Sequence, residues 1–337
     1  MIFFKILIAA MMIAAPAHAA RIKFATFAPE GTDAMKIMRL IDEDIQKATG
    51  GKLKFKFYAG GKQGDEKDVV RKIRIGQLHA GGFTGVGLGE IAPMVRILDA
   101  PWLFHDADEI DYIHKIFDRD FEAAFVKKGY LLLGWAEVGP AHIFSNKPVR
   151  TAADLQKLDI WVWEGDPIAE AAFAAVGVHP KPLSIADVNT SLQTGHIDSV
   201  YSAPLYAIAL QWHEKTKYVF SMPLANATGA VLLSKRFYNR LPKDQQNILL
   251  ESSRKHLKTL NGLTREKNRA AVETLKKHGL TFTDPASEQV VAEFEAAGRT
   301  ARRKLIGRLY SKELLDRVET ALAKFRANRS AKKGAKR

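Results

Sequence analysis

The sequence contains no cysteine among its 337 residues. This absence excludes disulfide bonds, thiolate nucleophiles and metal sites built on cysteine. The fold must therefore be held together by its core, and a hydrophobic content of 47% is sufficient to build one. The length suits two domains of ordinary size.

Long hydrophobic runs are also scarce, and the clearest one lies near the N-terminus. Residues 6–15 are apolar, Lys5 precedes them, and Ala17-His18-Ala19 follows. The run is too short to span a bilayer. Its order is typical of a signal peptide over residues 1–19, so we expect export to the periplasm and cleavage near Ala19.

Acidic residues are fewer than basic ones, with 37 against 51, which gives a formal net charge of +14. The final segment, residues 326–337, contains six cations and no acid. Such a segment could contact anionic surfaces, but a solvated and disordered terminus is the favoured interpretation, because export removes the protein from nucleic acid. It contains no aromatic residue, so we expect a disordered tail and no nucleic-acid partner.

A glycine-rich run at residues 81–89, GGFTGVGLG, partly matches a dinucleotide-binding fingerprint. Pro93 follows immediately, and no acidic residue closes a second strand at the required distance. We therefore interpret the run as a flexible loop that brings backbone close to a ligand or to another lobe.

Acidic residues and a histidine gather at residues 105–111, HDADEID, but their spacing fits no common zinc or calcium site. Acids at the start of an amphipathic helix are explained by the helix dipole alone. The other histidines are scattered, and no acid–base–nucleophile set is apparent. We expect no catalytic residue, no metal and no cofactor.

Residues 153–204 contain three short β-like runs, at 159–163, 178–183 and 197–201. Helical segments separate them, and one of these opens at Asp166 followed by proline, a typical helix start. Alternating strands and helices predict parallel strands in an α/β lobe. Ligands of such sheets bind beyond the carboxyl ends of the strands.

The first part of the chain repeats this organisation. Strands are predicted at 22–27, 52–58 and 79–84, with helices between them. Further along, a long helix is expected from Pro242 toward Lys277, followed by two more helices. The sequence thus predicts two similar α/β lobes.

Several segments resemble one protein family, the DctP-type solute receptors of TRAP (tripartite ATP-independent periplasmic) transporters. They are ADLQKLDIWV at 153–162, LQTGHID at 192–198, FYAGGKQGDEKDVVRKIRIGQLHAG at 57–81 and LLSKRFYNRLPKDQQ at 232–246. The resemblance covers roughly residues 21–322. It implies a two-lobed periplasmic-binding-protein-like fold, with a ligand cleft between the lobes and a long C-terminal helix spanning them.

The resemblance also implies partners and lobe boundaries. A monomeric receptor would capture a small organic solute and deliver it to small and large integral-membrane permease subunits. Lobe I is expected to comprise residues 20–145 with about 229–265. Lobe II is expected to comprise 146–228 with about 266–325, followed by the basic tail.

Aromatic residues gather in the predicted inter-lobe region, and they can form either a ligand cleft or ordinary core. We expect ligand contacts from these residues together with nearby polar groups at the predicted strand ends. The full set of expected ligand-binding residues is Trp161, Trp163, Trp135, Glu137, Glu164, Phe83, Thr84, Tyr201, Ser202 and Asp65.

The sequence departs from the family at one important position. By resemblance, an arginine that holds a substrate carboxylate would stand at Trp161, and a second arginine near Ala141. An arginine fork is the natural partner of a carboxylate. We therefore expect a cationic or neutral ring-bearing solute in place of a simple dicarboxylate, unless another arginine, such as Arg96 or Arg150, reaches the cleft.

Two other functions remain open at this point. The same fold could serve a periplasmic receptor that feeds a sensor kinase. A secreted α/β enzyme is a further alternative, and it would require a clustered acid–base pair that the sequence does not reveal.

Overall fold

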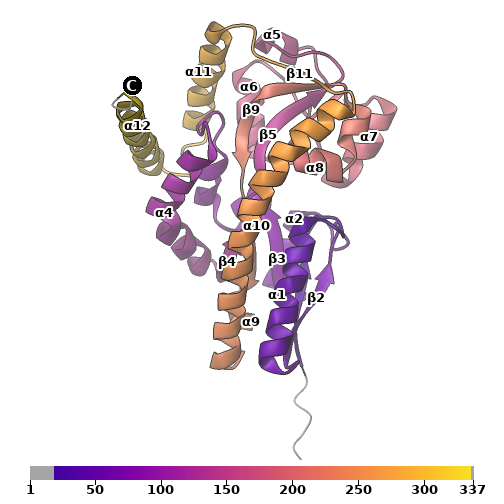
Figure 1. Ribbon diagram of the computed structural model, residues 1–337, viewed down its shortest axis with the longest axis vertical. Coiled ribbons are helices and arrows are strands. Elements are labelled where there is room, and N and C mark those ends of the chain that lie inside the picture. The colour runs from indigo at the N-terminus through magenta and orange to yellow at the C-terminus, as the bar shows by residue number, and fades with distance from the viewer. Residues whose placement is uncertain (1–18, 335–337) are drawn as a thin grey trace, which may run out of the picture.

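The computed structural model describes residues 19–334, which form two lobes with a long helix, α10 (Lys243–Lys277), running beside both (Figure 1). The predicted two-lobed α/β architecture and its long helix are confirmed. The expected signal segment, residues 1–19, lies outside the described part of the chain except for Ala19. No helix among residues 19–334 has the length and apolar character needed to cross a membrane.

The first lobe is built on a five-stranded sheet in the order β2-β1-β3-β10-β4. Its strands are β1 (Ala20–Ala25), β2 (Leu53–Tyr58), β3 (Ala80–Thr84), β4 (Tyr130–Trp135) and β10 (Gly229–Ser234). Its helices are α1 (Asp33–Thr49), α2 (Glu66–Arg74), α3 (Gly85–Ile91), the 3₁₀ helix η1 (Pro93–Asp99), α4 (Ala107–Lys127) and α9 (Lys235–Tyr238). β10 returns from the second lobe and pairs antiparallel with β3 and β4.

The second lobe contains a four-stranded sheet in the order β11-β9-β5-β8 and a separate parallel pair, β6-β7. Its strands are β5 (Gly139–Ser145), β6 (Trp161–Trp163), β7 (Lys181–Leu183), β8 (Ser199–Ser202), β9 (Tyr218–Ala227) and β11 (Thr281–Thr283). Its helices are α5 (Ala152–Leu155), α6 (Pro167–Ala175), η2 (Ile185–Asp187), α7 (Val188–Thr194), α8 (Pro204–Ala209), η3 (Trp212–Lys215) and α11 (Glu288–Lys304).

Local sequence explains many of these boundaries. Thr32 caps the start of α1 through its hydroxyl, and Gly50 ends the helix in the left-handed conformation at φ 58°. The N-cap of α6 is Asp166, followed by proline at the first helical position, as the sequence predicts. The strand predicted at 52–58 appears as β2, with alternating apolar residues such as Leu53 and Phe55 in the core.

The three β-like runs of residues 153–204 do not form one parallel sheet. β6 and β7 do pair in parallel, but β8 pairs antiparallel with β5 in the four-stranded sheet. Only an isolated bridge between Ile160 and Ser199 joins the first run to the third. That bridge is also parallel, so the three runs do have the parallel orientation that the sequence predicts. What the prediction lacked is β5, which precedes this stretch in the chain and is the main hydrogen-bonding partner of β8.

The glycine run at 81–89 is not a flexible loop. It forms the end of β3 and the start of α3. A Cβ atom on Gly85 would stand 1.7 Å from Oδ2 of Asp99, and one on Gly87 would stand 2.5 Å from the ring of Phe83. These glycines are required because neighbouring side chains pack directly against the backbone.

Two lobe boundaries also differ from expectation. β5 belongs to the second sheet, so lobe I ends before Gly139 and not at residue 145. The last helix, α12 (Lys312–Gly334), packs on the first lobe, because its Leu315 and Val318 join the same apolar cluster as Phe117 of α4. The preceding helix, α11, packs on α6 of the second lobe.

Residues 326–334 lie within α12, in place of the expected disordered tail. Two charged contacts hold this part of the helix against the start of α4. Arg326 pairs with both carboxylate oxygens of the buried Glu109, each at 2.7 Å, and Arg329 pairs with Asp106. Two of the six cations in residues 326–337 are therefore partners of acids at residues 105–111.

Candidate functional site

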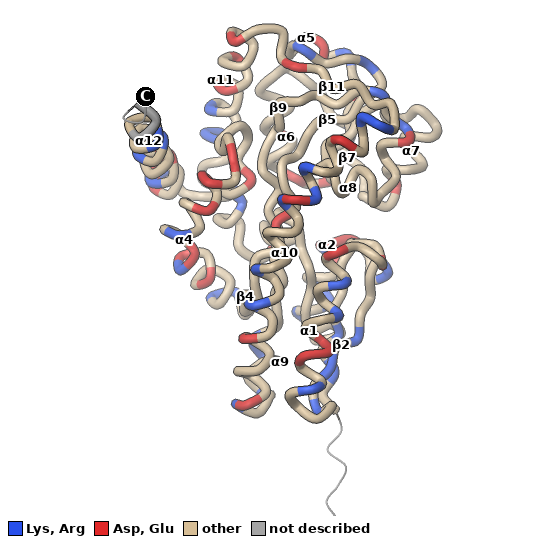
Figure 2. Tube along the Cα trace, viewed as in Figure 1, with Lys and Arg blue, Asp and Glu red and all other residues tan. Residues whose placement is uncertain are grey.

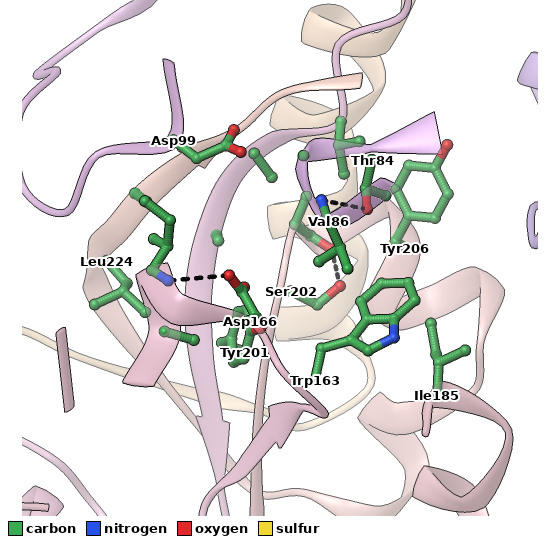
Figure 3. Close-up of a pocket in the computed structure, with 18 of the residues that line it drawn as sticks. Thr84, Val86, Asp99, Trp163, Asp166, Ile185, Tyr201, Ser202, Tyr206 and Leu224 are labelled. Carbon is green, nitrogen blue, oxygen red and sulfur yellow. Dashed lines mark hydrogen bonds between the residues drawn. The ribbon is translucent and has the colours of Figure 1, made fainter. Parts of the chain in front are cut away.

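A cavity of about 110 Å³ lies where the two lobes meet (Figure 3). This volume is several times the roughly 10–15 Å³ that one water molecule needs. The first lobe contributes the junction of β3 and α3 together with η1, and the second contributes β6, the start of α6 and the ends of β8 and β9. Six aromatic side chains border the cavity: Phe27, Trp161, Trp163, Tyr201, Tyr206 and Trp212.

Trp161 forms the centre of the aromatic wall on the second lobe. Its ring stacks on Tyr201 at a centroid distance of 5.2 Å and meets Trp212 edge-on at 5.3 Å. Its indole N–H donates to the carbonyl oxygen of Leu183 at 3.0 Å. Only 2% of Trp161 is exposed, so the residue is at once a cavity wall and part of the core.

Trp163 extends the wall toward the first lobe. Its indole N–H donates to the carboxylate of Asp65, with distances of 2.9 and 3.1 Å to the two oxygens. The ring of Phe27 meets it edge-on at 5.7 Å. Ser184 donates to the same Asp65 at 3.2 Å, and Lys67 reaches the carbonyl oxygen of Glu164. These contacts join the lobes and hold the protein in a closed arrangement.

The charged residues at the cavity form a single group. Arg96 donates to Asp99 through Nε and to Asp166 through Nη2, both at 2.8 Å. The three side chains are at least nine-tenths buried, with 4%, 6% and 3% of each residue exposed. Arg96 and Asp99 come from the first lobe, whereas Asp166 caps α6 in the second. The arginine is therefore engaged on both sides by the protein's own carboxylates.

Burial and charge act in opposite directions on this group. Burial raises the pKa of Asp99 to about 6, against the opposing effects of Arg96 and of the N–H of Thr228, which donates to Asp99. Burial alone would lower the pKa of Arg96, but the charges of Asp166 and Asp99 outweigh it and raise that pKa. The arginine is consequently a fixed cation at neutral pH.

A buried glutamate shapes the first-lobe wall. Glu66, which follows the N-cap Asp65, accepts hydrogen bonds from the backbone N–H and the hydroxyl of Thr84 and from the N–H of Gly87. These distances are 2.6 to 2.9 Å. Burial raises the pKa of Glu66 to about 7 despite the three donors. The carboxyl thereby fixes the chain at residues 84–87 against the cavity.

One polar side chain at the cavity lacks a protein partner. Asn226, on β9, lines the cavity and is 7% exposed. Its amide nitrogen is buried and has no hydrogen-bond partner among the described residues. Leaving such a donor unsatisfied is costly in a protein interior. Because the nitrogen is buried, it is not exposed to the cavity and offers no direct contact to a bound molecule.

The structure brings half of the expected ligand-binding residues to this cavity. Five of them line it: Trp161, Trp163, Thr84, Tyr201 and Ser202. Asp65 stands behind Trp163 and binds its N–H. Ala141, near which the resemblance implies a second arginine, also lines the cavity, whereas the exposed Arg150 does not.

The other expected residues lie elsewhere. Trp135 packs against Phe121 and Phe125 of α4, and Phe83 is buried in the same lobe. Glu137 accepts a hydrogen bond from Arg265 of α10 at 2.7 Å. Glu164 is exposed and offers only its backbone carbonyl to Lys67. Each was expected from its place near a strand end, but the side chains face away from the cavity.

Several cavity residues were not found from the sequence. Asp99, Tyr206, Trp212 and Asn226 lie in segments without a distinct motif, and Arg96 was considered only as an alternative. The available signal for η1 was an arginine inside an otherwise apolar segment, residues 91–98. No group of three or more histidine, aspartate or glutamate side chains within residues 19–334 is arranged to hold a metal ion.

Comparison with known proteins gives a consistent result. The model of the bacterial extracellular solute-binding protein family 7 matches residues 24–306. The C4-dicarboxylate-binding periplasmic protein of Rhodobacter capsulatus is 22% identical over 292 residues, covering 84% of this chain and 86% of that protein.

Solved structures agree in fold. A Bordetella pertussis extracytoplasmic solute receptor binding pyroglutamic acid has a TM-score of 0.82 at 21% identity, covering 90% of this chain and all of that one. A TRAP periplasmic solute-binding protein from Desulfovibrio salexigens with bound orotic acid has a TM-score of 0.82 at 19% identity, covering 90% and 99%. With its family match over most of the length, two lobes and a cavity between them, the chain belongs to the bacterial extracellular solute-binding protein family 7, the DctP family of TRAP solute receptors.

Proposed function

We propose that this protein captures a small organic solute in the cavity between its lobes and presents the closed form to the small and large membrane subunits of a TRAP permease. The proposal includes two further points: residues 1–19 direct export of the protein, and the receptor acts as a monomer. The observation that carries it is the cavity itself, which is lined by residues of both lobes. A receptor of this kind binds and releases its solute without chemistry.

The contacts between the lobes support a hinged cycle. The Trp163–Asp65 hydrogen bonds and the Arg96–Asp166 ion pair join the lobes beside the cavity and would separate when the lobes open. These are few and local, so opening leaves both sheets intact. A solute that touches both walls would add to the same contacts and favour the closed form.

The test is to identify the small molecule that co-purifies with the protein by mass spectrometry and then to return it to solute-free protein. We expect a smaller radius of gyration in X-ray scattering and a higher melting temperature on its addition. Trp163→Phe keeps an aromatic ring but removes the N–H donor to Asp65. At the same fraction of solute-bound protein, the radius of gyration of this variant should therefore decrease less. Tight binding without any compaction would contradict the hinge, and uptake measured with and without the permease subunits would test delivery.

We also propose that simple C4-dicarboxylates and 2-keto acids bind weakly or not at all. Trp161 cannot neutralise a carboxylate, and Arg96 is already paired with two aspartates. The missing charge-assisted pair corresponds to roughly two decades in affinity. Titration calorimetry with succinate is the measurement, and micromolar binding would contradict the proposal.

A further inference from the structure

The cavity combines a surplus of carboxylate with an aromatic lining. Among the residues that the structure describes, its charged lining consists of Arg96, Asp99 and Asp166, which gives a formal charge of −1 when all are ionised. The protein as a whole carries a formal charge of +14, and basic residues are spread over both lobes (Figure 2). The negative cavity is thus a local feature and does not follow from composition.

One of the two carboxylates retains capacity to accept a hydrogen bond. Oδ1 of Asp166 accepts from Arg96 and from the backbone N–H of Ile168. Oδ2 has a single partner, the hydroxyl of Tyr201, at a long 3.4 Å. By contrast, Asp99 is engaged through both oxygens, by Thr228 and by Arg96. Oδ2 of Asp166 is therefore the open acceptor at the cavity.

Two of the aromatic residues, Trp163 and Tyr206, lie on the other side of this space. Figure 3 shows Asp99 and Asp166 toward one side of the cavity and Trp163 with Tyr206 toward the other. Rings of this kind attract cations through their faces and pack well against apolar groups. A carboxylate placed here would meet two buried aspartates and no uncommitted cation, which is unfavourable in a site shielded from water.

We propose that the solute is a protonated amine with a ring or compact apolar body. Its ammonium donates to Oδ2 of Asp166, and its body packs against the aromatic side of the cavity, at Trp163 and Tyr206. This inference rests on the proposed receptor function and names its substrate class.

The experiment compares three ligands of one shape and three charges: benzylamine, benzyl alcohol and benzoate. Each is titrated by calorimetry into the full-length mature protein at pH 7.5, after removal of any co-purified solute. We expect benzylamine to bind at least tenfold more tightly than benzyl alcohol, and benzoate to bind most weakly. Equal affinities, tighter binding of benzoate, or no binding of benzylamine would overturn the proposal.

Two matched variants locate the effect. Asp166→Asn keeps an oxygen that can cap α6 but removes the charge, so benzylamine should lose about tenfold while benzyl alcohol is unchanged. Asp159→Asn removes the same charge from an exposed residue that precedes β6 and pairs with Lys181, and it should change neither affinity. If Asp166→Asn does not fold, the three-ligand comparison on the natural protein still decides.

The outcome separates this proposal from the receptor function. An acid that binds tightly and compacts the protein in scattering would overturn the charge class and leave the receptor function standing. A protein that carries no co-purified molecule and is compacted by no ligand would contradict the receptor function itself.

Discussion

The two walls of the cavity are built in different ways. On the first lobe, the wall at residues 84–86 is largely backbone and small side chains, held in place by hydrogen bonds to the buried Glu66. On the second lobe, the wall is a group of large rings, with Trp161 at its centre. One wall is positioned by a single carboxyl group and the other by packing. Substitutions in the first wall should therefore act by removing hydrogen bonds, and substitutions in the second wall should act by removing packing contacts.

The largest effect should come from Trp161→Ala. Because the ring is almost fully buried against Tyr201 and Trp212, its removal should lower the free energy of unfolding by about 3–5 kcal/mol. Urea denaturation measures this change. Trp161→Phe is the matched control, since it retains a ring and should lose less. A loss under about 1 kcal/mol for the alanine variant would show that the second wall is not held by packing.

A smaller effect is expected from Glu66→Gln on the first wall. The amide NH₂ would face the N–H of Gly87 in place of an acceptor, which should cost about 1–3 kcal/mol at pH 5. Glu90→Gln is the control, because Glu90 is exposed and its contact with Lys67 spans 3.9 Å. It should change stability by no more than about 0.5 kcal/mol.

The Glu66→Gln variant should also change how the free energy of unfolding depends on pH. The folded protein raises the pKa of Glu66 to about 7 from an ordinary value of 4.5. The folded state therefore holds a proton that the unfolded state has released, and this contribution to stability is lost as pH rises from about 4.5 to about 7. Glu66→Gln should remove that part of the pH dependence. A gap between the two proteins that is constant from pH 5 to pH 8 would contradict the raised pKa.

The smallest effect should come from Asp198→Asn, which touches neither wall. Asp198 accepts from the backbone N–H of Asp159 at 2.9 Å and pairs with the exposed Lys147 at 3.0 Å. Asparagine retains one acceptor, so we expect a loss of about 0.5–1.5 kcal/mol with ligand affinity unchanged. Reduced affinity at an unchanged melting temperature would place Asp198 in the binding machinery.

The two walls also differ in how far the sequence predicts them. Trp161, Trp163 and Tyr201 were found because rings at the ends of predicted strands are visible in the sequence. The role of Glu66 was not found, because its bonds to Thr84 and Gly87 depend on how α2 meets the end of β3. Local patterns located most strands and α10, but strand partners depend on distant segments, as the pairing of β8 with β5 shows.

Helix α10 has a consequence for how the protein comes apart. Its 35 residues extend about 50 Å. Leu257 and Leu260 belong to an apolar cluster of the first lobe, and Leu275 belongs to one of the second. Neither lobe can lose the helix without opening its own core, and β10 ties the chain back to the first sheet. The two lobes should therefore melt together, in one calorimetric transition, even though they move separately when the cavity opens.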